Sequence, residues 1–204
     1  MSGDVEVAME DARNIRWNAD QFLLWAVEQT DRWELVRGTP IKMMGGARMG
    51  HNRAVRNIMR SLGSQLANGP CEEFAADMAV RTAVDQIRYP DVVVNCGGGD
   101  DRDLEAANPV MVAEVFSDST QPFDARDKLE EYQGLTTLRY ILLVETRRRA
   151  VELYQRDAAV GMAWNSTRFE KEGWIELPEI QVSLTLDDIY ANMDPSPRMT
   201  IVRP

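Results

Sequence analysis

Three apolar runs constrain the fold of this chain more than any other feature. They are Val92–Val94, VMVAEVF (110–116) and LRYILLVE (138–145). None of them shows the regular alternation of apolar and polar residues that a strand with one solvated face requires. Runs of this kind are typical of central strands that are buried on both faces. The sequence therefore predicts an α/β fold in which helices cover a sheet.

The segments around these runs supply the expected helices and outer strands. Asn18 or Asp20 is expected to cap a short helix, and His51–Leu66 to form a long helix with one apolar face. Further helices are predicted over Phe123–Gln133 and over LTLDDIYANM (184–193). The remaining predicted strands are WELVRG (33–38), PIKMMG (40–45), EEFAA (72–76), MAVRTAV (78–84) and an antiparallel β-meander at AVELYQR (150–156), AVGMAW (159–164) and the Trp174 region. This order predicts a mixed β-sheet flanked by helices, with the meander toward the C-terminus.

The chain is long enough for one domain with a well-buried core, and it contains no linker or internal repeat. Residues 1–17 are expected to form a flexible leader, 18–193 the single domain, and 194–204 a flexible tail interrupted by prolines. The N-terminus lacks the apolar core of a secretory signal, and no apolar run approaches the roughly 20 residues of a membrane-spanning helix. The sequence gives no reason to expect a membrane partner.

The two cysteines bear on the redox state of the compartment in which the protein is located. Cys71 and Cys96 are far apart and neither belongs to a CxxC pair. The sequence therefore predicts neither a disulfide framework nor a zinc site, and a reduced, cytoplasmic location is expected.

The charge distribution bears on nucleic-acid binding. The formal net charge is −10, which opposes binding to phosphates. Between residues 32 and 60, however, seven basic residues stand against the single acid Glu34. Arg53, Arg56 and Arg60 recur at intervals of three and four, so they share one face of the predicted long helix. This face is either a local positive surface on an acidic body or an ordinary solvated helix face.

Two carboxylates interrupt or adjoin the apolar runs. Asp91 precedes the run Val92–Val94, and Glu114 lies inside VMVAEVF. A carboxylate in such a strand costs several kcal/mol unless it is paired, hydrogen-bonded or bound to a metal. Two of them on neighbouring strands would form an oxygen site suited to Mg²⁺ or Mn²⁺, which activates water for phosphodiester cleavage. The alternative is an outward-facing Glu114 at a sheet edge.

Several segments together resemble a known family. PDVVV (90–94), AEVFSDST (113–120) and DARDKLEEYQG (124–134) follow one another, and WELVRGTPIKMMGG (33–46) and GHNRAV (50–55) precede them. In this order and spacing they resemble the Uma-type family of restriction-endonuclease-like proteins, within the PD-(D/E)XK nuclease superfamily. The resemblance covers about residues 20–156.

The resemblance implies a restriction-endonuclease-like fold and a catalytic set. Asp91 and Glu114 are implied as metal ligands. The superfamily's lysine usually stands two residues after the glutamate, where this chain has Phe116, and Lys128 on the next helix matches the family's lysine instead. Glu34 matches an early glutamate of the family and is implied as a fourth catalytic residue. Its alternative is an outward-facing strand position.

Residues around Lys128 and at the start of the long helix leave further alternatives. Asp124, Lys128 and Tyr132 recur at intervals of four, which also fits a salt bridge beside a packed tyrosine. His51, the only histidine, matches a family position that implies a phosphate contact, and capping or packing is the alternative.

Three functions are compatible with these observations. The first is a Mg²⁺-dependent (or Mn²⁺-dependent) endonuclease that hydrolyses DNA, with Arg53, Arg56 and His51 as nucleic-acid contacts. The second is a catalytically silent nuclease-fold module that binds nucleic acid or protein, which the acidic net charge favours. The third is a structural or oligomeric partner protein. A homodimer is compatible with each of them.

Overall fold

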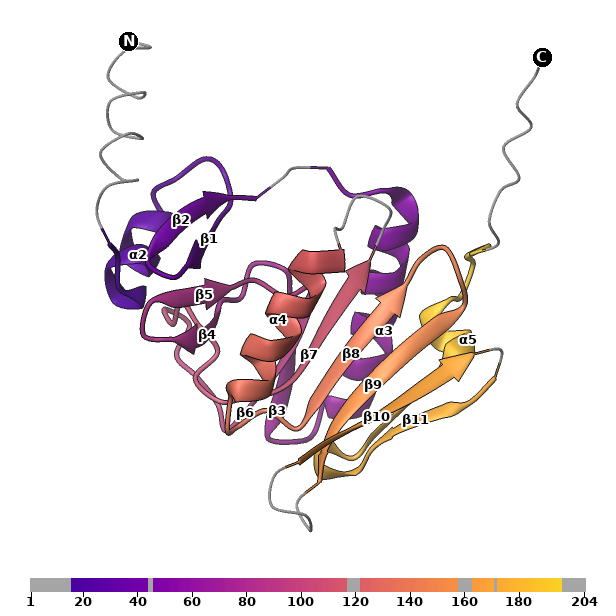
Figure 1. Ribbon diagram of the computed structural model, residues 1–204. Helices are drawn as coiled ribbons and strands as arrows, with labels where there is room; N and C mark the ends of the chain where they lie inside the picture. Colours follow the sequence, from indigo (N-terminus) through magenta and orange to yellow (C-terminus); the bar gives the residue numbers. More distant parts are fainter. Residues whose placement is uncertain (1–15, 44–45, 117–121, 158–162, 171, 196–204) are drawn as a thin grey trace, which may run out of the picture.

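Six strands form the central sheet of the computed structural model, which describes residues 16–43, 46–116, 122–157, 163–170 and 172–195 (Figure 1). Their order is β10-β9-β8-β7-β6-β3. Strands β7 and β8 run parallel, and the other neighbouring pairs are antiparallel. The strands span Cys71–Ala75 (β3), Val92–Cys96 (β6), Pro109–Phe116 (β7), Tyr140–Glu145 (β8), Ala150–Asp157 (β9) and Ala163–Glu170 (β10). The predicted mixed sheet is therefore present, with the three apolar runs at its centre.

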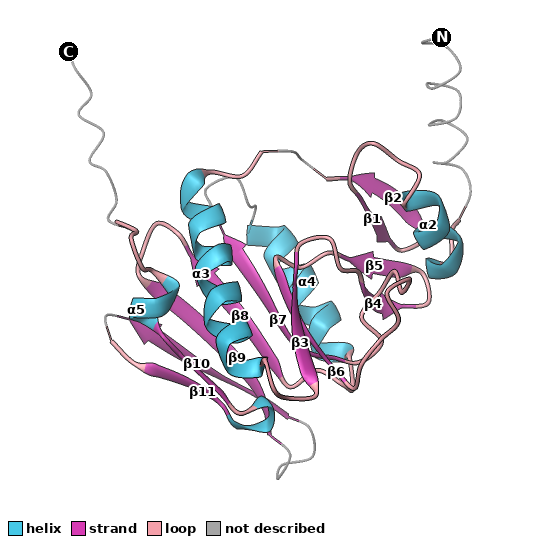
Figure 2. Cartoon of the chain, turned by 180° about the vertical axis from the view of Figure 1, so that it is seen from behind, coloured by secondary structure: helices cyan, strands magenta, loops and turns pink. Residues whose placement is uncertain are grey.

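Helices cover both faces of this sheet, which explains why its central strands lack polar alternation. Helix α4 (Pro122–Gly134) lies over the face toward the viewer in Figure 1, and α3 (Met49–Leu66) over the opposite face in Figure 2. Val92 and Val94 belong to the core on the α3 side, whereas Val93 packs with residues of α4. Alternate residues of one strand thus serve two cores, and both must be apolar.

A second sheet packs beside the first and was not expected as a separate unit. Its strands have the order β2-β1-β5-β4 and are all antiparallel. They span Trp33–Val36 (β1), Thr39–Lys42 (β2), Val80–Ala83 (β4) and Gln86–Arg88 (β5). Helix α2 (Ala19–Ala26) supplies Phe22 to a core that includes Leu35 and Ile87. Asn18 caps this helix through a capping box with Gln21, which decides between the two expected caps.

The C-terminal part departs from the expected meander. Strands β9 and β10 form a hairpin, but β11 (Trp174–Leu177) pairs with β12 (Val182–Thr185) in a separate two-stranded sheet, with a 3₁₀ turn at Pro178–Ile180 between them. Helix α5 spans only Leu186–Ile189, and the side chain of Thr185 caps its N-terminus. The carbonyls of Ile189 and Ala191 accept hydrogen bonds from the buried amide of Asn57, and Asn192 has a left-handed backbone (φ 59°), so the helix ends early.

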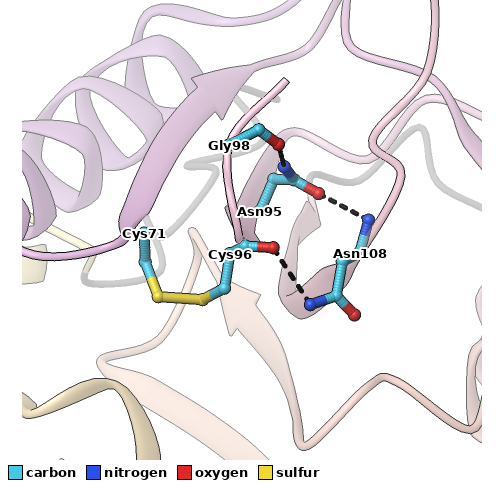
Figure 3. The surroundings of a disulfide bond; sticks show 5 residues. All are labelled: Cys71, Asn95, Cys96, Gly98 and Asn108. Carbon is cyan, nitrogen blue, oxygen red and sulfur yellow. Dashed lines mark hydrogen bonds between the residues drawn. A yellow bond between two sulfur atoms is a disulfide. The ribbon is translucent and has the colours of Figure 1, made fainter.

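The expectation for the cysteines was wrong. Cys71 and Cys96 form a disulfide that joins β3 to β6 (Figure 3). The two residues are 25 positions apart in sequence but directly opposite in the antiparallel register of these strands. A search for short cysteine motifs could not detect this pairing, because register brings the residues together. Hydrogen bonds from Asn108 to Asn95 and to the carbonyl of Cys96 fix the neighbouring loop.

The terminal segments expected to be flexible fall largely outside the described residues, as do Met44 and Gly45 of the predicted strand PIKMMG and the first part of AVGMAW. In the portion of the chain that is described, no helix combines the length and apolarity needed to cross a membrane.

Candidate active site

Asp91 and Glu114 face the same point from adjacent strands. Val92 pairs with Ala113 and Val93 with Val112 in the antiparallel register of β6 and β7. One further step along that register brings Asp91 opposite Glu114, and directly opposed side chains in a sheet lie on the same face. The main-chain N–H of Val115 donates to Oδ2 of Asp91 at 2.8 Å. The N–H and carbonyl of one residue point to the same edge of a strand, so the Val115 carbonyl also faces β6.

Glu114 is buried, with 7% of its surface exposed. Its Oε1 accepts a hydrogen bond from the hydroxyl of Tyr132 at 2.8 Å and lies 3.8 Å from Nζ of Lys128. Burial raises the pKa of Glu114 to about 7, against the attraction of Lys128, and the negative charge of Asp91 adds to the increase. The alternative of a water-facing Glu114 at a sheet edge is thus inconsistent with the structure.

Lys128 reaches the cluster from α4, and its Nζ lies 2.9 Å from Oε1 of Glu34 on β1. Glu34 also accepts a hydrogen bond at 2.8 Å from Arg88 on β5. Burial alone would raise the pKa of Glu34, but Lys128 and Arg88 together hold it below its ordinary value. The two sheets therefore meet at this lysine, because Glu34 comes from the smaller sheet and Glu114 from the larger one.

A ring of ion pairs surrounds Lys128. Arg88 donates two hydrogen bonds to Glu131, at 2.7 and 2.6 Å, and Glu131 stands three residues after Lys128 on α4. The pairs Lys128–Glu34, Glu34–Arg88 and Arg88–Glu131 thus begin and end on the same helix. This closed ring fixes the position of the lysine relative to both sheets. The side chain of Asp124, the other expected partner of Lys128, lies outside the described residues.

His51 lies at the N-terminal end of α3, beside Asp91. Its Nε2 is 3.1 Å from Oδ1 of Asp91, and this hydrogen bond is the main cause of the raised pKa of His51. Its Nδ1 is buried and has no hydrogen-bond partner among the described residues. The family resemblance implied a phosphate contact for His51, with capping or packing as the alternative, and the structure places its ring against a candidate metal ligand.

Arg53, Arg56 and Arg60 follow His51 along α3, with Arg56 and Arg60 exposed and Arg53 half-buried. The opposite face of α3 packs on the sheet through Ala54 and Ile58. None of the three arginines forms an ion pair with any residue that the structure describes, and α3 itself contains no acidic residue. They therefore place three positive charges along one side of α3, between its first turn and its middle.

Glu34, Asp91, Glu114 and Lys128, the site residues expected from the sequence, lie close together in the structure, and they have partners that the sequence did not reveal. Arg88 lies in QIRYP, only three residues before Asp91. This closeness in sequence was the one signal that could have pointed to Arg88 as a neighbour of the site. Tyr132 was noted for its spacing from Lys128 and interpreted as a packed ring. Glu131 carried no distinguishing signal, since adjacent acidic residues on a helix are common.

The donor set fits a divalent cation. The cluster holds four carboxylates but two permanent cations, so negative charge is in excess. The carboxylates are Glu34, Asp91, Glu114 and Glu131, and the cations are Arg88 and Lys128. The described residues contain no group of three His, Cys, Asp or Glu side chains spaced to hold a metal. Mg²⁺ typically takes one or two carboxylates and completes its shell with water, so two carboxylates and the Val115 carbonyl are an adequate set.

One cavity of the described chain lies away from this cluster. It has a volume of about 870 Å³ and is lined near the Cys96 end of β6 by residues that include Cys71, Phe74 and Met78. Asp91 is at the opposite end of that strand. The cavity therefore does not coincide with the carboxylate cluster, and the chemistry is assigned from the side chains.

Comparison with known proteins identifies the family of the chain. The family model Uma2, described as "Putative restriction endonuclease", matches residues 19–187. The protein sll1609 of Synechocystis sp., described as uncharacterized, is 30% identical over 142 residues, which cover 68% of this chain and 80% of the relative. A second uncharacterized protein of the same organism, slr1290, is 26% identical over 176 residues, which cover 85% of this chain and 91% of the relative.

A solved structure is also similar. It is a protein from Anabaena variabilis, described as a putative nuclease of the DUF820 family, with a TM-score of 0.67 and 16% sequence identity. The match covers 86% of this chain and 98% of that one. At this identity the likeness shows the fold alone, and it confirms the predicted nuclease-like mixed sheet flanked by helices.

Proposed function

The chain belongs to the Uma2 family of restriction-endonuclease-like proteins, and from this premise we propose that it is a Mg²⁺-dependent endonuclease that hydrolyses DNA phosphodiester bonds. One observation carries the proposal. Asp91 and Glu114 oppose each other on adjacent strands, and Lys128 approaches the same point from α4. Carboxylates of this arrangement with a nearby lysine are the parts that metal-assisted phosphodiester hydrolysis needs.

Asp91, Glu114 and the carbonyl of Val115 would hold the metal, which is Mg²⁺ or Mn²⁺ by the chemistry of these oxygen donors. When bound, such an ion activates water and stabilises charge on the phosphate. His51 and the N–H of Val115 each engage one oxygen of Asp91, so they fix its orientation. Each carboxylate oxygen has a second lone pair, so these hydrogen bonds leave capacity for an ion.

Lys128 acts on the water and the phosphate. Its ammonium can donate hydrogen bonds to the attacking water and to a phosphate oxygen on which negative charge increases. Glu34 holds it at 2.9 Å, which limits its freedom and keeps the amino group near Glu114. In other members of the superfamily the strand that carries the glutamate also carries the lysine, but here Phe116 occupies that position. The ion pairs through Glu34 and Arg88 would position Lys128 instead.

Arg53 and Arg56 would contact phosphates of the DNA. They are close in sequence to His51, and they have no ion-pair partner among the described residues. An arginine without an ion-pair partner has no neighbouring carboxylate to offset its charge, so it can attract a phosphate. Phosphate contacts account for most non-specific affinity for DNA. This local surface offsets the net charge of −10 where the substrate would lie.

A second candidate function is a nuclease-fold binding module without turnover. The net charge of −10 favours it, since a chain with a large acid surplus repels nucleic acid outside the arginine face. In such a module, replacing Arg53 and Arg56 would weaken DNA binding, whereas replacing Asp91 or Glu114 would not change the cleavage of DNA.

The test is cleavage of plasmid DNA in Mn²⁺ by the wild type and by single variants. Asp91→Ala and Glu114→Ala are expected to abolish cleavage, and Lys128→Ala to slow it by orders of magnitude. Glu130→Ala is the matched control, because Glu130 lies on the same helix and its side chain is 65% exposed. Cleavage that survives Glu114→Ala unchanged would mean that the activity belongs to another site.

Two further parts of the proposal concern the setting of the protein. We place it in the cytoplasm because its DNA substrate is available there; the Cys71–Cys96 bridge removes the earlier argument from cysteine usage for a reduced compartment. We also propose a homodimer, which light scattering of the purified protein at several concentrations would detect.

A further inference from the structure

Among the described residues, the two side chains that contact the carboxylate of Glu114 meet the same oxygen. Tyr132 donates to Oε1 at 2.8 Å, and Lys128 lies 3.8 Å from Oε1. The two residues are four positions apart on α4, so they approach from one side of the carboxylate. Oε2 accepts no hydrogen bond from any residue that the structure describes. Helix α4 therefore holds one oxygen of Glu114 and leaves the other available.

The Tyr132 hydroxyl is committed to this contact. Tyr132 is fully buried, and its ring packs in the core on the α4 side of the sheet with Val93, Val112 and Ile141. A buried phenol needs a hydrogen-bond partner, and the carboxylate of Glu114 is the acceptor for Tyr132. Packing explains the ring, but it does not require that the hydroxyl point at a carboxylate of the candidate metal site.

We propose that Tyr132 is a positioning residue of the metal site, whose hydroxyl holds Oε1 of Glu114 so that Oε2 faces the ion. The inference rests on the proposed function, because it assumes that Glu114 is a metal ligand. A carboxylate on a side chain with three rotatable bonds loses conformational freedom when it binds an ion. A donor that fixes the rotamer beforehand reduces that cost, which is how outer hydrogen bonds raise metal affinity.

The matched pair of variants is Tyr132→Phe and Tyr190→Phe. Each removes one hydroxyl and keeps a buried ring. Among the described residues, the hydroxyl of Tyr190 forms hydrogen bonds with main-chain atoms alone. It donates to the carbonyls of Glu145 and Ala150 and accepts from the N–H of Ala150. Mn²⁺ affinity is measured by calorimetry on the full chain, and the melting temperature is measured in EDTA as the control for folding.

A positioning role predicts that Tyr132→Phe weakens Mn²⁺ binding by about ten-fold or more, the usual effect of losing an outer hydrogen bond, while Tyr190→Phe leaves it unchanged. A purely structural role predicts that both variants lower the melting temperature and neither changes Mn²⁺ affinity. That second result would overturn the inference.

The failure of the inference and the failure of the proposed function give different results. If the wild type binds Mn²⁺ and Tyr132→Phe binds it equally well, the inference alone is wrong. If the wild type binds Mn²⁺ no better than Asp91→Ala does, the metal site itself is wrong, and the inference is overturned with it.

Discussion

Replacing Glu114 by glutamine tests the electrostatics of the site without any metal. The folded protein raises the pKa of Glu114 from its ordinary 4.5 to about 7, chiefly through burial. Between these values the folded state retains a proton on Glu114 that the unfolded state has lost. The contribution of Glu114 to the free energy of unfolding must therefore fall as the pH rises from 4.5 to 7, and it stays low above that range.

The size of this fall follows from the pKa difference. Each pKa unit corresponds to about 1.4 kcal/mol, so 4.5 and about 7 differ by about 3 kcal/mol. Glutamine resembles the protonated acid in shape and can accept the hydrogen bond from Tyr132. We therefore expect Glu114→Gln to match the wild type near pH 4.5 and to exceed it by about 3 kcal/mol at pH 8.

The assay is urea unfolding in EDTA at several pH values from 4.5 to 8.5, with the variant compared with the wild type at each pH. Effects of titrating groups that do not interact with Glu114 cancel in this difference. Glu130→Gln is the control and should give a difference that does not depend on pH, since its side chain is 65% exposed. A flat difference for Glu114→Gln as well would refute the conclusion that the folded state disfavours ionised Glu114.

Three further predictions follow from the same structure. Millimolar Mg²⁺ should raise the melting temperature of the wild type and release protons at pH 6–7, and Asp91→Ala should abolish both effects in calorimetry. The double change Arg53→Ala and Arg56→Ala should weaken DNA binding and make its logarithmic salt dependence shallower by about 1 for each arginine that touches a phosphate; an unchanged slope in fluorescence titrations would exclude these contacts. Reduction of the Cys71–Cys96 bridge should lower the free energy of unfolding by about 3.5 kcal/mol, as estimated for a 25-residue loop, and leave Mn²⁺ affinity unchanged.

The centre of the fold could be predicted because burial leaves a direct record in sequence. Val92–Val94 and the run around Glu114 are apolar without alternation, since α3 and α4 cover both faces of the sheet. The same background made Asp91 and Glu114 conspicuous, because a carboxylate is costly in a buried strand. The role of Lys128 came from family resemblance, because its spacing of four from Asp124 and Tyr132 also fits an ordinary salt bridge beside a packed tyrosine.

The contacts that complete the cluster could not be predicted, because they depend on how two sheets pack. Arg88 joins Glu34 on one strand to Glu131 on a helix, across 54 and 43 residues of sequence. The Cys71–Cys96 bridge has the same origin, since strand register alone brings the two residues together. Local patterns carry no information on register between distant segments, so such pairs emerge only from the fold.

The most direct test of the account is the position of a metal ion in crystals soaked with Mn²⁺, located by its anomalous scattering. We predict one ion between Asp91 and Glu114, bound by Oε2 of Glu114 and by the Val115 carbonyl, with the Tyr132 hydrogen bond to Oε1 retained. Crystals that show no ion at this point, with Glu114 still contacted only by Tyr132 and Lys128, would contradict the central claim that these carboxylates form a metal site.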